Sequence, residues 1–206
     1  MAKSINLKRV EQIFEESIAV KKQCVKMGFD SIIDMSKIAT SSIVKGNKIM
    51  LCGNGGSAAD AQHIAAEMLV RLHPETSREG IPAIALAQDT SSITACGNDF
   101  GFENLYKRMV KTLGKKGDCL IVISTSGNSK NIILAIKAAH QIGINVFGFF
   151  GCRGGEAINH CDQAFLVPSM DTGRIQEAHI TAGHALVDCI EQNLLNIGFL
   201  HLQNQI

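Results

Sequence analysis

The 206-residue chain has almost no excess charge, since 20 basic and 19 acidic residues give a formal net charge of +1. A charge so close to zero provides no general electrostatic attraction to nucleic acid or to a membrane surface. No apolar run approaches the roughly 18 residues that a membrane span requires, and the N-terminal Met-Ala-Lys-Ser has no apolar signal core. We therefore expect a cytoplasmic protein that binds a small molecule or another protein, and neither nucleic acid nor a membrane.

The sequence also has no Cys-x-x-Cys pair, although it contains seven cysteines. Several of them lie inside apolar runs, which indicates buried thiols in a reducing compartment rather than disulfides or metal ligands. No repeat or low-complexity segment is present, and a chain of this length can bury a core without covalent cross-links. We expect one domain over residues 1–206, with N-terminal helices at 5–45 and an α/β core at 48–198.

From Lys48 onward, short apolar runs alternate with segments of helical periodicity, which predicts parallel strands joined by crossover helices. The predicted strands are 48–53, 82–87, 118–123, 145–150 and 163–167. The predicted helices are 57–72, 90–97, 103–113, 129–142, 154–160 and 173–197. This pattern is typical of a doubly wound α/β sheet, which binds ligands beyond the carboxyl ends of its strands.

Two further helical patterns, at 5–28 and 32–44, precede the first strand and therefore cannot be crossovers. Their apolar faces must be buried against the flank of the sheet or against another subunit. We expect oligomerisation to be the use of the first of them. The segment 74–82, bounded by two prolines, is the expected mobile loop.

The first predicted strand ends in a glycine-rich turn at residues 53–57, which opens a helical pattern. Backbone N–H groups at a helix N-terminus stabilise an anion, and Ser57 is the expected N-cap. On the same helix, His63 and Glu67 are four residues apart, so their side chains share one face. The unit therefore offers a phosphate-sized cradle and two groups for metal binding or proton transfer.

A second turn follows the third predicted strand and is rich in hydroxyl groups: Ser124, Thr125, Ser126 and Ser129. Small hydroxyls and backbone amides at a helix N-terminus suit a phosphate. The turn matches neither the P-loop nor the dinucleotide-binding glycine turn. On this turn alone, a phosphate site and an ordinary capped helix start remain equally open.

Two other turns are predicted to have structural roles. Residues 97–102 form a polar turn in which Asp99 is expected to be an N-cap or turn former. The glycine-rich segment 151–155 carries neither an acid nor a set of hydroxyls.

The last predicted helix carries Gln176 and His184, eight residues or about 12 Å apart along an ideal helix. Both could reach a metal between them only if their side chains lean toward each other, and a lone histidine on a helix is more often a core or surface residue. If this helix faces the one that carries His63 and Glu67, the four side chains supply two nitrogens and two oxygens. Such a set suits zinc or another divalent first-row ion.

Four motifs keep their order and spacing along the chain: Cys52 to His63 with Glu67, Gly97 to Glu103, Ile123 to Ser129, and Arg174 to His184. Together they resemble the phosphoheptose isomerases, which are sugar isomerase (SIS) domain enzymes that convert sedoheptulose 7-phosphate into glycero-manno-heptose 7-phosphate. The hydroxyl-rich turn alone would indicate only an SIS domain. The combination with Glu67 and His184 makes the resemblance specific.

This resemblance implies a three-layer, flavodoxin-like αβα sandwich with a five-stranded parallel sheet, and a homotetramer with active sites at its subunit interfaces. It also implies a divalent ion, usually zinc, held by His63, Glu67, Gln176 and His184. The substrate contacts that it implies are Asn54, Gly55, Gly56, Glu67, Asn98, Asp99, Ser124, Thr125, Ser126, Ser129 and Gln176.

Isomerisation of a ketose to an aldose moves a proton between C1 and C2 through an enediol, so it requires a base and an acid. Glu67 is the expected base and His184 the expected acid, while the metal would polarise the carbonyl. Because tight binding to zinc weakens a carboxylate as a base, we expect Glu67 to loosen from the metal during turnover. The reaction would open the biosynthesis of nucleotide-activated heptose, as used for lipopolysaccharide.

Two alternatives remain. One is a non-catalytic SIS tetramer that binds the replication initiator protein, a branch in which the position of Glu67 is commonly not acidic and the hydroxyl turn is altered. The other is a different sugar-phosphate SIS enzyme, such as an etherase that acts on N-acetylmuramic acid 6-phosphate, which would lack the set of His63, Gln176 and His184.

Overall fold

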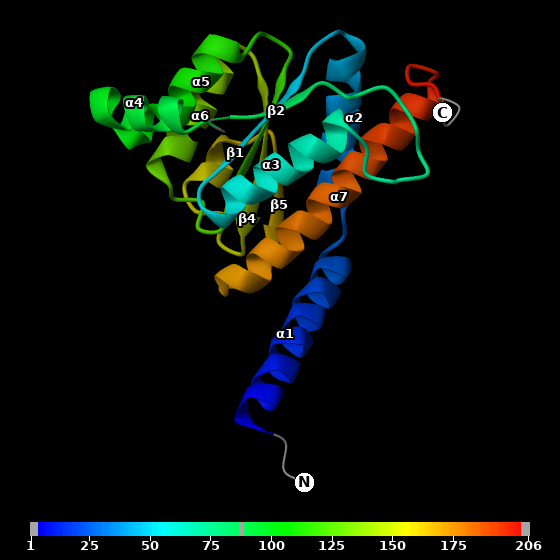
Figure 1. Ribbon diagram of the computed structural model, residues 1–206, viewed down its shortest axis with the longest axis vertical. Coiled ribbons are helices and arrows are strands. Elements are labelled where there is room, and N and C mark those ends of the chain that lie inside the picture. Colours follow the sequence, from blue (N-terminus) through cyan, green and yellow to red (C-terminus); the bar gives the residue numbers. More distant parts are fainter. Residues whose placement is uncertain (1–3, 87–88, 203–206) are drawn as a thin grey trace.

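The computed structural model describes residues 4–86 and 89–202 of the chain. Its centre is a parallel five-stranded sheet with the order β2-β1-β3-β4-β5 (Figure 1), which is the flavodoxin-like order. The strands are β1 (Ile49–Gly53), β2 (Ala83–Ala85), β3 (Cys119–Ser124), β4 (Asn145–Gly151) and β5 (Gln163–Val167). All five lie within two residues of the predicted ranges, although residue 87 of the second predicted strand is outside the described residues.

Helices cover both faces of the sheet, which confirms the three-layer αβα architecture (Figure 1). Leu51 and Ile121 point into one core, and their neighbours Met50 and Leu120 point into the other. Both faces of the strands are therefore apolar, as in other parallel sheets. The first core is closed by α2 (Asp30–Val44), α3 (Gly56–Leu69) and α7 (Thr172–Asn196), and the second by α4 (Thr90–Phe100), α5 (Leu105–Leu113) and α6 (Lys130–Gln141).

Two of the predicted local structures are wrong. The helix expected at 154–160 is only the 3₁₀ helix η2 (Ala157–His160), because Gly154 and Gly155 have φ angles of 62° and 60° that no right-handed helix contains. The polar turn expected at 97–102 is mostly helix: α4 continues to Phe100 and ends at Gly101, where φ is 82°. The 3₁₀ helix η1 (Phe102–Asn104) then leads into α5.

Helix α1 (Ile5–Met27) projects away from the body of the molecule (Figure 1). Its one buried residue is Cys24, whereas seven of its large apolar side chains are at least 46% exposed: Ile5, Leu7, Val10, Phe14, Ile18, Val25 and Met27. A long helix does not normally present so many apolar side chains to water. Its use in oligomerisation therefore stays a prediction that the exposed surface supports.

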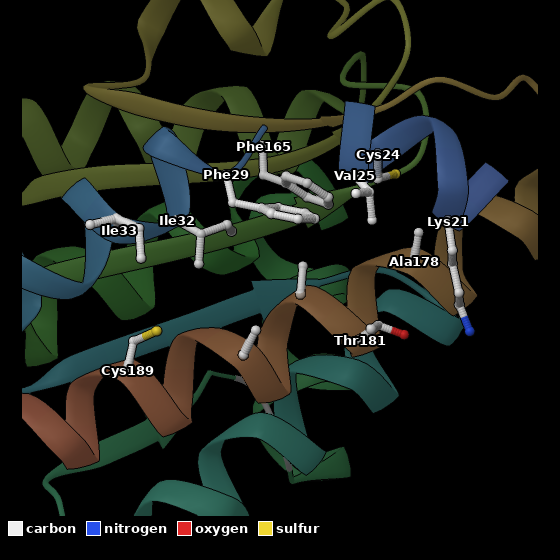
Figure 2. Close-up of a pocket in the computed structure, with 12 residues that line it drawn as sticks. Lys21, Cys24, Val25, Phe29, Ile32, Ile33, Phe165, Ala178, Thr181 and Cys189 are labelled. Atoms are coloured by element: carbon white, nitrogen blue, oxygen red, sulfur yellow. The ribbon is translucent and has the colours of Figure 1, made fainter. Parts of the chain in front are cut away.

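Where α1 and α2 meet α7, an apolar cavity of about 300 Å³ opens, with Phe29 and Phe165 on one side and Ala178 on the other (Figure 2). The two phenyl rings stack with centroids 6.5 Å apart. Most of the wall is aliphatic or aromatic, and its side chains with polar or sulfur atoms are Lys21, Cys24, Thr181 and Cys189. The apolar surface of α1 thus continues into the body of the molecule.

No disulfide joins the seven cysteines, all of which lie within the described residues. Four of them are buried as predicted, Cys161 and Cys189 are partly exposed, and Cys152 is exposed, so the prediction of buried thiols is wrong for Cys152. Across residues 4–86 and 89–202, no helix is both long enough and apolar enough to cross a membrane.

Candidate active site

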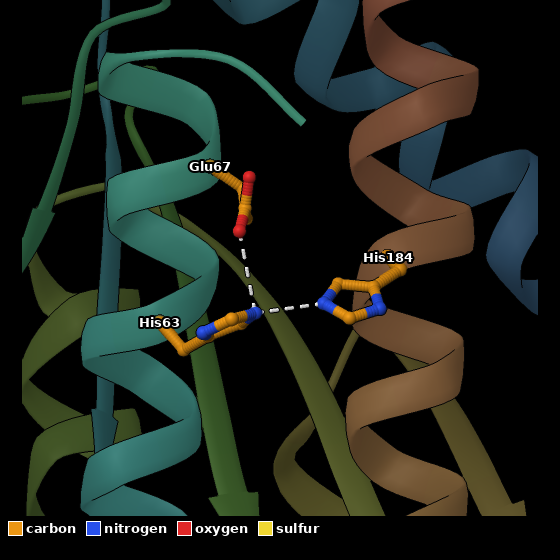
Figure 3. Close-up of side chains that lie close together, drawn as sticks. All are labelled: His63, Glu67 and His184. Atoms are coloured by element: carbon orange, nitrogen blue, oxygen red, sulfur yellow. Dashed lines mark hydrogen bonds and ion pairs between the residues drawn. The ribbon is translucent and has the colours of Figure 1, made fainter. Parts of the chain in front are cut away.

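Helices α3 and α7 lie side by side and bring three of the predicted site residues together (Figure 3). The Nε2 atoms of His63 and His184 are 2.8 Å apart, and His63 Nε2 lies 3.3 Å from Oε1 of Glu67. One ligand atom from each of the three residues lies within 4.8 Å of the others. The predicted pair on one helix face is therefore joined by a histidine from a helix more than 100 residues further along the chain.

The electrostatics of this cluster favour the neutral form of the His184 imidazole. Burial lowers the pKa of His184 and the neighbouring His63 lowers it further, whereas the Glu67 carboxylate raises it. His63 is exposed, and His184 and Glu67 are half-buried. Two imidazole nitrogens and a carboxylate oxygen around one point, open to solvent on one side, match a catalytic zinc site with three protein ligands and one free position.

Two glycines allow α3 and α7 to approach closely. A Cβ atom on Gly183 of α7 would lie 2.4 Å from Cδ1 of Ile64, the residue that follows His63. A Cβ atom on Gly56 would lie 2.5 Å from Nε2 of Gln176. Gln176 thus packs on the first turn of α3, about 10 Å along the helix axis from His63. It belongs to the same pair of helices, and its role as a metal ligand stays a prediction.

The turn after β1 differs from the prediction at its helix cap. Gly55 is the N-cap of α3 with φ 57° and ψ −123°, and its carbonyl accepts the N–H groups of Ala58 and Ala59. Only glycine adopts this backbone conformation readily, so Ser57, predicted as the N-cap, lies inside the helix and is buried. The Asn54 amide exchanges two hydrogen bonds with the Asn131 amide, at 2.9 and 2.8 Å, which ties this turn to the start of α6.

The hydroxyl-rich turn after β3 is held by its own side chains. Ser124 Oγ accepts the Gly127 N–H at 3.1 Å, and Ser126 Oγ accepts the Asn128 N–H at 3.2 Å. Since both oxygens act as acceptors, their O–H groups remain donors for an anion. Ser129 is the N-cap of α6, and within the described residues its hydroxyl makes no capping bond.

Thr125 and Ser126 line a cavity of about 240 Å³ at the carboxyl ends of β3, β4 and β5. Its wall also includes Arg153, Ser169 and Thr172, none of which was predicted as a site residue. Each of them follows the carboxyl end of β4 or β5 within a few residues, which is the signal that could have found them. Arg153 adds a positive charge beside the hydroxyls.

The glycines of the segment 151–155 pack tightly, as expected of a structural segment, but the prediction missed that Cys152 and Arg153 between them line the cavity. A Cβ atom on Gly127 would lie only 1.9 Å from the Gly154 carbonyl oxygen, and the Gly151 N–H donates to the Thr125 carbonyl at 3.2 Å. The two loops pack backbone against backbone, which only glycine permits. This contact fixes the shape of the hydroxyl-rich turn.

Asn98 and Asp99 lie apart from the triad of His63, Glu67 and His184. Both are exposed in the last turn of α4, where Asn98 Nδ2 donates to Asp99 Oδ1 at 2.7 Å. Helix α4 covers the opposite face of the sheet from α3 and α7 (Figure 1). Their predicted contact with substrate stays a prediction, and a single chain does not bring them to the triad.

His179, on α7 between Gln176 and His184, belongs to the core. It is fully buried, and its ring centroid lies 6.0 Å from that of Phe149. Burial lowers the pKa of His179 to about 4, so the imidazole is neutral at physiological pH.

Residues 12–151 of the chain match the family model of the SIS domain. Among curated proteins, the phosphoheptose isomerase of Aquifex aeolicus is 47% identical over 186 residues, covering 90% of this chain and 96% of that protein. The phosphoheptose isomerase of Clostridium acetobutylicum is 47% identical over 187 residues, covering 90% of this chain and 94% of that protein.

Solved structures agree with these relatives. The phosphoheptose isomerase structure from Neisseria gonorrhoeae is 41% identical, with a TM-score of 0.85 over 90% of this chain and 98% of that one. The structure from Francisella tularensis is 36% identical, with a TM-score of 0.87 over 92% of this chain and all of that one.

Proposed function

This chain belongs to the phosphoheptose isomerases of the SIS domain family, and we propose that it converts D-sedoheptulose 7-phosphate into D-glycero-D-manno-heptose 7-phosphate with the help of a divalent metal ion. The observation that carries the proposal is the convergence of His63, Glu67 and His184 between α3 and α7. Each of the three residues directs an atom with a free lone pair toward the same solvent-accessible point. Such an arrangement does not stabilise the fold by itself, but it suits a bound metal ion. A non-catalytic protein that binds a replication initiator would have no use for them.

In the proposed reaction, the Glu67 carboxylate removes a proton from C1 of the ketose and returns it to C2. His184 gives a proton to O2 as the enediol forms and accepts the O1 proton as the aldose forms. The Glu67 carboxylate and the His184 imidazole have atoms within 4.8 Å of each other, a spacing that would let both act on one carbon pair, which is the first requirement for acid–base catalysis. A divalent ion held by His63, Glu67 and His184, with Gln176 as a further ligand, would supply Lewis-acid polarisation of the carbonyl.

The phosphate of the substrate would lie at the hydroxyl-rich turn after β3. The hydroxyls of Ser124, Thr125, Ser126 and Ser129 would act as neutral donors to the phosphate near the N-terminus of α6, where the helix dipole favours an anion. Arg153, beside the same cavity, would add charge compensation. The turn after β1, with Asn54, Gly55 and Gly56, would contact the sugar.

The complete site would require more than one subunit. Asn98 and Asp99 lie on the far face of the sheet from the triad, and α1 exposes an apolar face. Both features fit a homotetramer in which neighbouring subunits cover α1 and supply Asn98 and Asp99 to the site. We expect this assembly to act in the cytoplasm, in the first step of nucleotide-activated heptose biosynthesis.

The reaction is tested by NMR of sedoheptulose 7-phosphate incubated with the enzyme before and after treatment with a chelator. We expect the signals of the aldose to appear, to stop increasing on chelation, and to resume when zinc is added back. Turnover that continues at full rate in the presence of chelator would show that the reaction does not require a metal ion. Absence of the aldose with zinc present would refute the reaction.

Metal binding is tested independently by thermal unfolding with and without zinc. An ion that binds only the folded chain at 100 times its dissociation constant stabilises it by about 2.7 kcal/mol. We expect zinc to raise the melting temperature of the wild type. It should raise that of the control variant His140→Ala equally, because His140 is an exposed histidine that lies outside the site. The same zinc addition should leave the melting temperature of His184→Ala unchanged. An equal increase in all three proteins would contradict metal binding at His184.

A further inference from the structure

A second cluster of charge lies under the C-terminal end of α3. Arg78, in the loop between α3 and β2, and Glu191, on α7, form an ion pair in which neither side chain has any exposed surface. The Arg78 Nε–H donates to Oε2 of Glu191. The segment 74–82, expected to be mobile, is therefore anchored at its centre.

The two terminal nitrogens of the Arg78 guanidinium donate hydrogen bonds to backbone carbonyls, most of them at the end of α3. One terminal nitrogen donates to the carbonyl of Glu67 at 3.0 Å, and the other donates to the carbonyls of Met68 at 3.0 Å, Glu79 at 3.0 Å and Val70 at 3.4 Å. The last carbonyls of a helix have no partner within the helix and carry its negative dipole end. A buried cation at this point both satisfies and neutralises them.

This guanidinium is linked to both helices of the triad. The carbonyl of Glu67 that it holds belongs to the residue whose carboxylate faces His63 and His184. Glu191 lies seven residues after His184, two turns along the same face of α7. Among the described residues, Oε1 of Glu191 has no hydrogen-bond partner, so the anchor on α7 depends on Arg78.

We propose that Arg78 is a positioning residue for the isomerisation, which with Glu191 holds the turn of α3 that carries Glu67 at a fixed place relative to His184. This proposal rests on the proposed function. Arg78 acts through the backbone of Glu67 and does not touch the substrate. A shift of about 1 Å in a reacting group can cost 100-fold in rate, so fixing this spacing matters for the proton transfer.

Stability alone does not explain the choice of these residues. Replacing a buried ion pair with apolar side chains of similar volume is often neutral or stabilising, whereas removing one partner is strongly destabilising. An apolar pair at these positions would fill the same space but could not hold the carbonyls of α3. Lysine would keep the charge, yet its single ammonium cannot reach the carboxylate and several carbonyls in the geometry of a planar guanidinium.

The chain offers a matched control at another place in the fold. Asp118, at the amino end of β3, is fully buried and pairs with Lys48 at 2.6 Å. It also accepts the backbone N–H groups of Lys48 and Lys115. Within residues 4–86 and 89–202, no hydrogen bond or ion pair of these two side chains reaches α3 or α7.

The test compares Arg78→Lys and the double variant Arg78→Met/Glu191→Leu with the control Lys48→Met/Asp118→Leu. We expect both variants at the Arg78 site to lower kcat about 100-fold while the KM for sedoheptulose 7-phosphate stays within twofold. The control should keep the kcat of the wild type per folded molecule. A normal kcat in Arg78→Met/Glu191→Leu would overturn the proposal, as would a loss of kcat in the control of the same size. If the double variant does not fold, Arg78→Lys alone decides.

Two further measurements separate positioning from other causes. In a Glu67→Gln background, adding Arg78→Lys should lower the residual rate less than twofold, and a second 100-fold loss would show that Arg78 does not act through Glu67. Amide hydrogen exchange at residues 67–70 should be faster in Arg78→Lys than in the wild type, whether or not the enzyme is active. A wild type without isomerase activity refutes the proposed function, whereas unchanged exchange in Arg78→Lys refutes the positioning role.

Discussion

The triad of His63, Glu67 and His184 and the buried carboxylate of Asp118 are two charged clusters with opposite hydrogen-bond arrangements. Asp118 accepts three N–H groups, from the Lys48 ammonium and from the backbone of Lys48 and Lys115, and has no exposed surface. In the triad, two imidazole nitrogens meet at 2.8 Å with a carboxylate oxygen beside them, and water reaches the site. A buried group whose hydrogen bonds are all made within the protein stabilises the fold. Groups whose lone pairs converge on one accessible point are arranged to bind a metal ion.

The difference follows from where the chain places each group. Asp118 lies at the start of β3, where neighbouring backbone N–H groups need acceptors. The triad lies between the outer sides of α3 and α7, and the two helices touch there through Gly183. The comparison predicts that substitutions in the triad affect activity and leave stability intact, and that substitutions at Asp118 do the reverse.

The largest effect is expected for Glu67→Gln. We expect turnover of sedoheptulose 7-phosphate to fall about 1,000-fold, within the range typical of a general base, because glutamine cannot accept the C1 proton. Glu67 is half-buried and lies on the surface of α3, so the melting temperature without metal should change little. NMR turnover and calorimetry of the same samples measure both. An active Glu67→Gln enzyme would remove Glu67 from the mechanism.

His179 and His184 allow the comparison to be made on one helix. Burial lowers the pKa of His179 from 6.5 to about 4, so between these pH values the unfolded chain binds a proton that the folded chain does not. The contribution of His179 to stability is therefore complete above pH 6.5 and decreases by about 3 kcal/mol as the pH falls to 4. Urea unfolding at pH 8 and at pH 5 should show a smaller difference in His179→Leu than in the wild type. Equal differences would mean that His179 is solvated in the folded state.

The sequence predicts the sheet well because its strands are short, apolar and bounded by polar turns. The spacing of His63 and Glu67 also predicts their shared helix face, since that depends only on helical geometry. The meeting of these residues with His184 depends on the packing of α3 against α7, which no local pattern records. The shared metal site of these residues was predicted only through the resemblance to the phosphoheptose isomerases.

The errors have local physical causes. Ser57 has the composition of an N-cap, but the backbone of Gly55 takes the cap position with a conformation that serine avoids. The polar residues 97–99 suggested a turn, yet the cap at Asp89 and the glycine at 101 allow a longer helix. Arg78 gave no signal at all, because its partner Glu191 is 113 residues away in the sequence.

Asp118→Asn tests the other half of the comparison, in which a substitution should affect stability and leave activity intact. The amide cannot neutralise the Lys48 ammonium. Oδ1 of Asp118 accepts the Lys48 N–H and Oδ2 accepts the Lys115 N–H, so an asparagine would place its NH2 group against one of these donors, and we expect a loss of about 2 kcal/mol in the free energy of unfolding. Because Lys48 is 27% exposed, its ammonium can turn to solvent, which limits the cost. Chemical denaturation measures the loss, and kcat per folded molecule should equal that of the wild type. A large decrease in kcat would show that the two clusters are coupled.

The smallest effect on stability is expected for Gly183→Ala, which moves α7 relative to α3 without removing any functional group. Alanine is favoured over glycine inside a helix by about 1 kcal/mol, and this gain offsets the displacement of Ile64, whose Cδ1 lies 2.4 Å from the new Cβ. The free energy of unfolding should therefore change by less than about 1 kcal/mol, while turnover falls several-fold because His184 is pushed away from His63 and Glu67. The new Cβ would also lie 2.8 Å from Cγ1 of Ile64, so the second variant must remove both atoms. Adding Ile64→Ala does so and should restore turnover, although this change alone costs about 2–5 kcal/mol in stability. If turnover remained low in the double variant, the spacing of α3 and α7 at Gly183 would not be what sets the geometry of the triad.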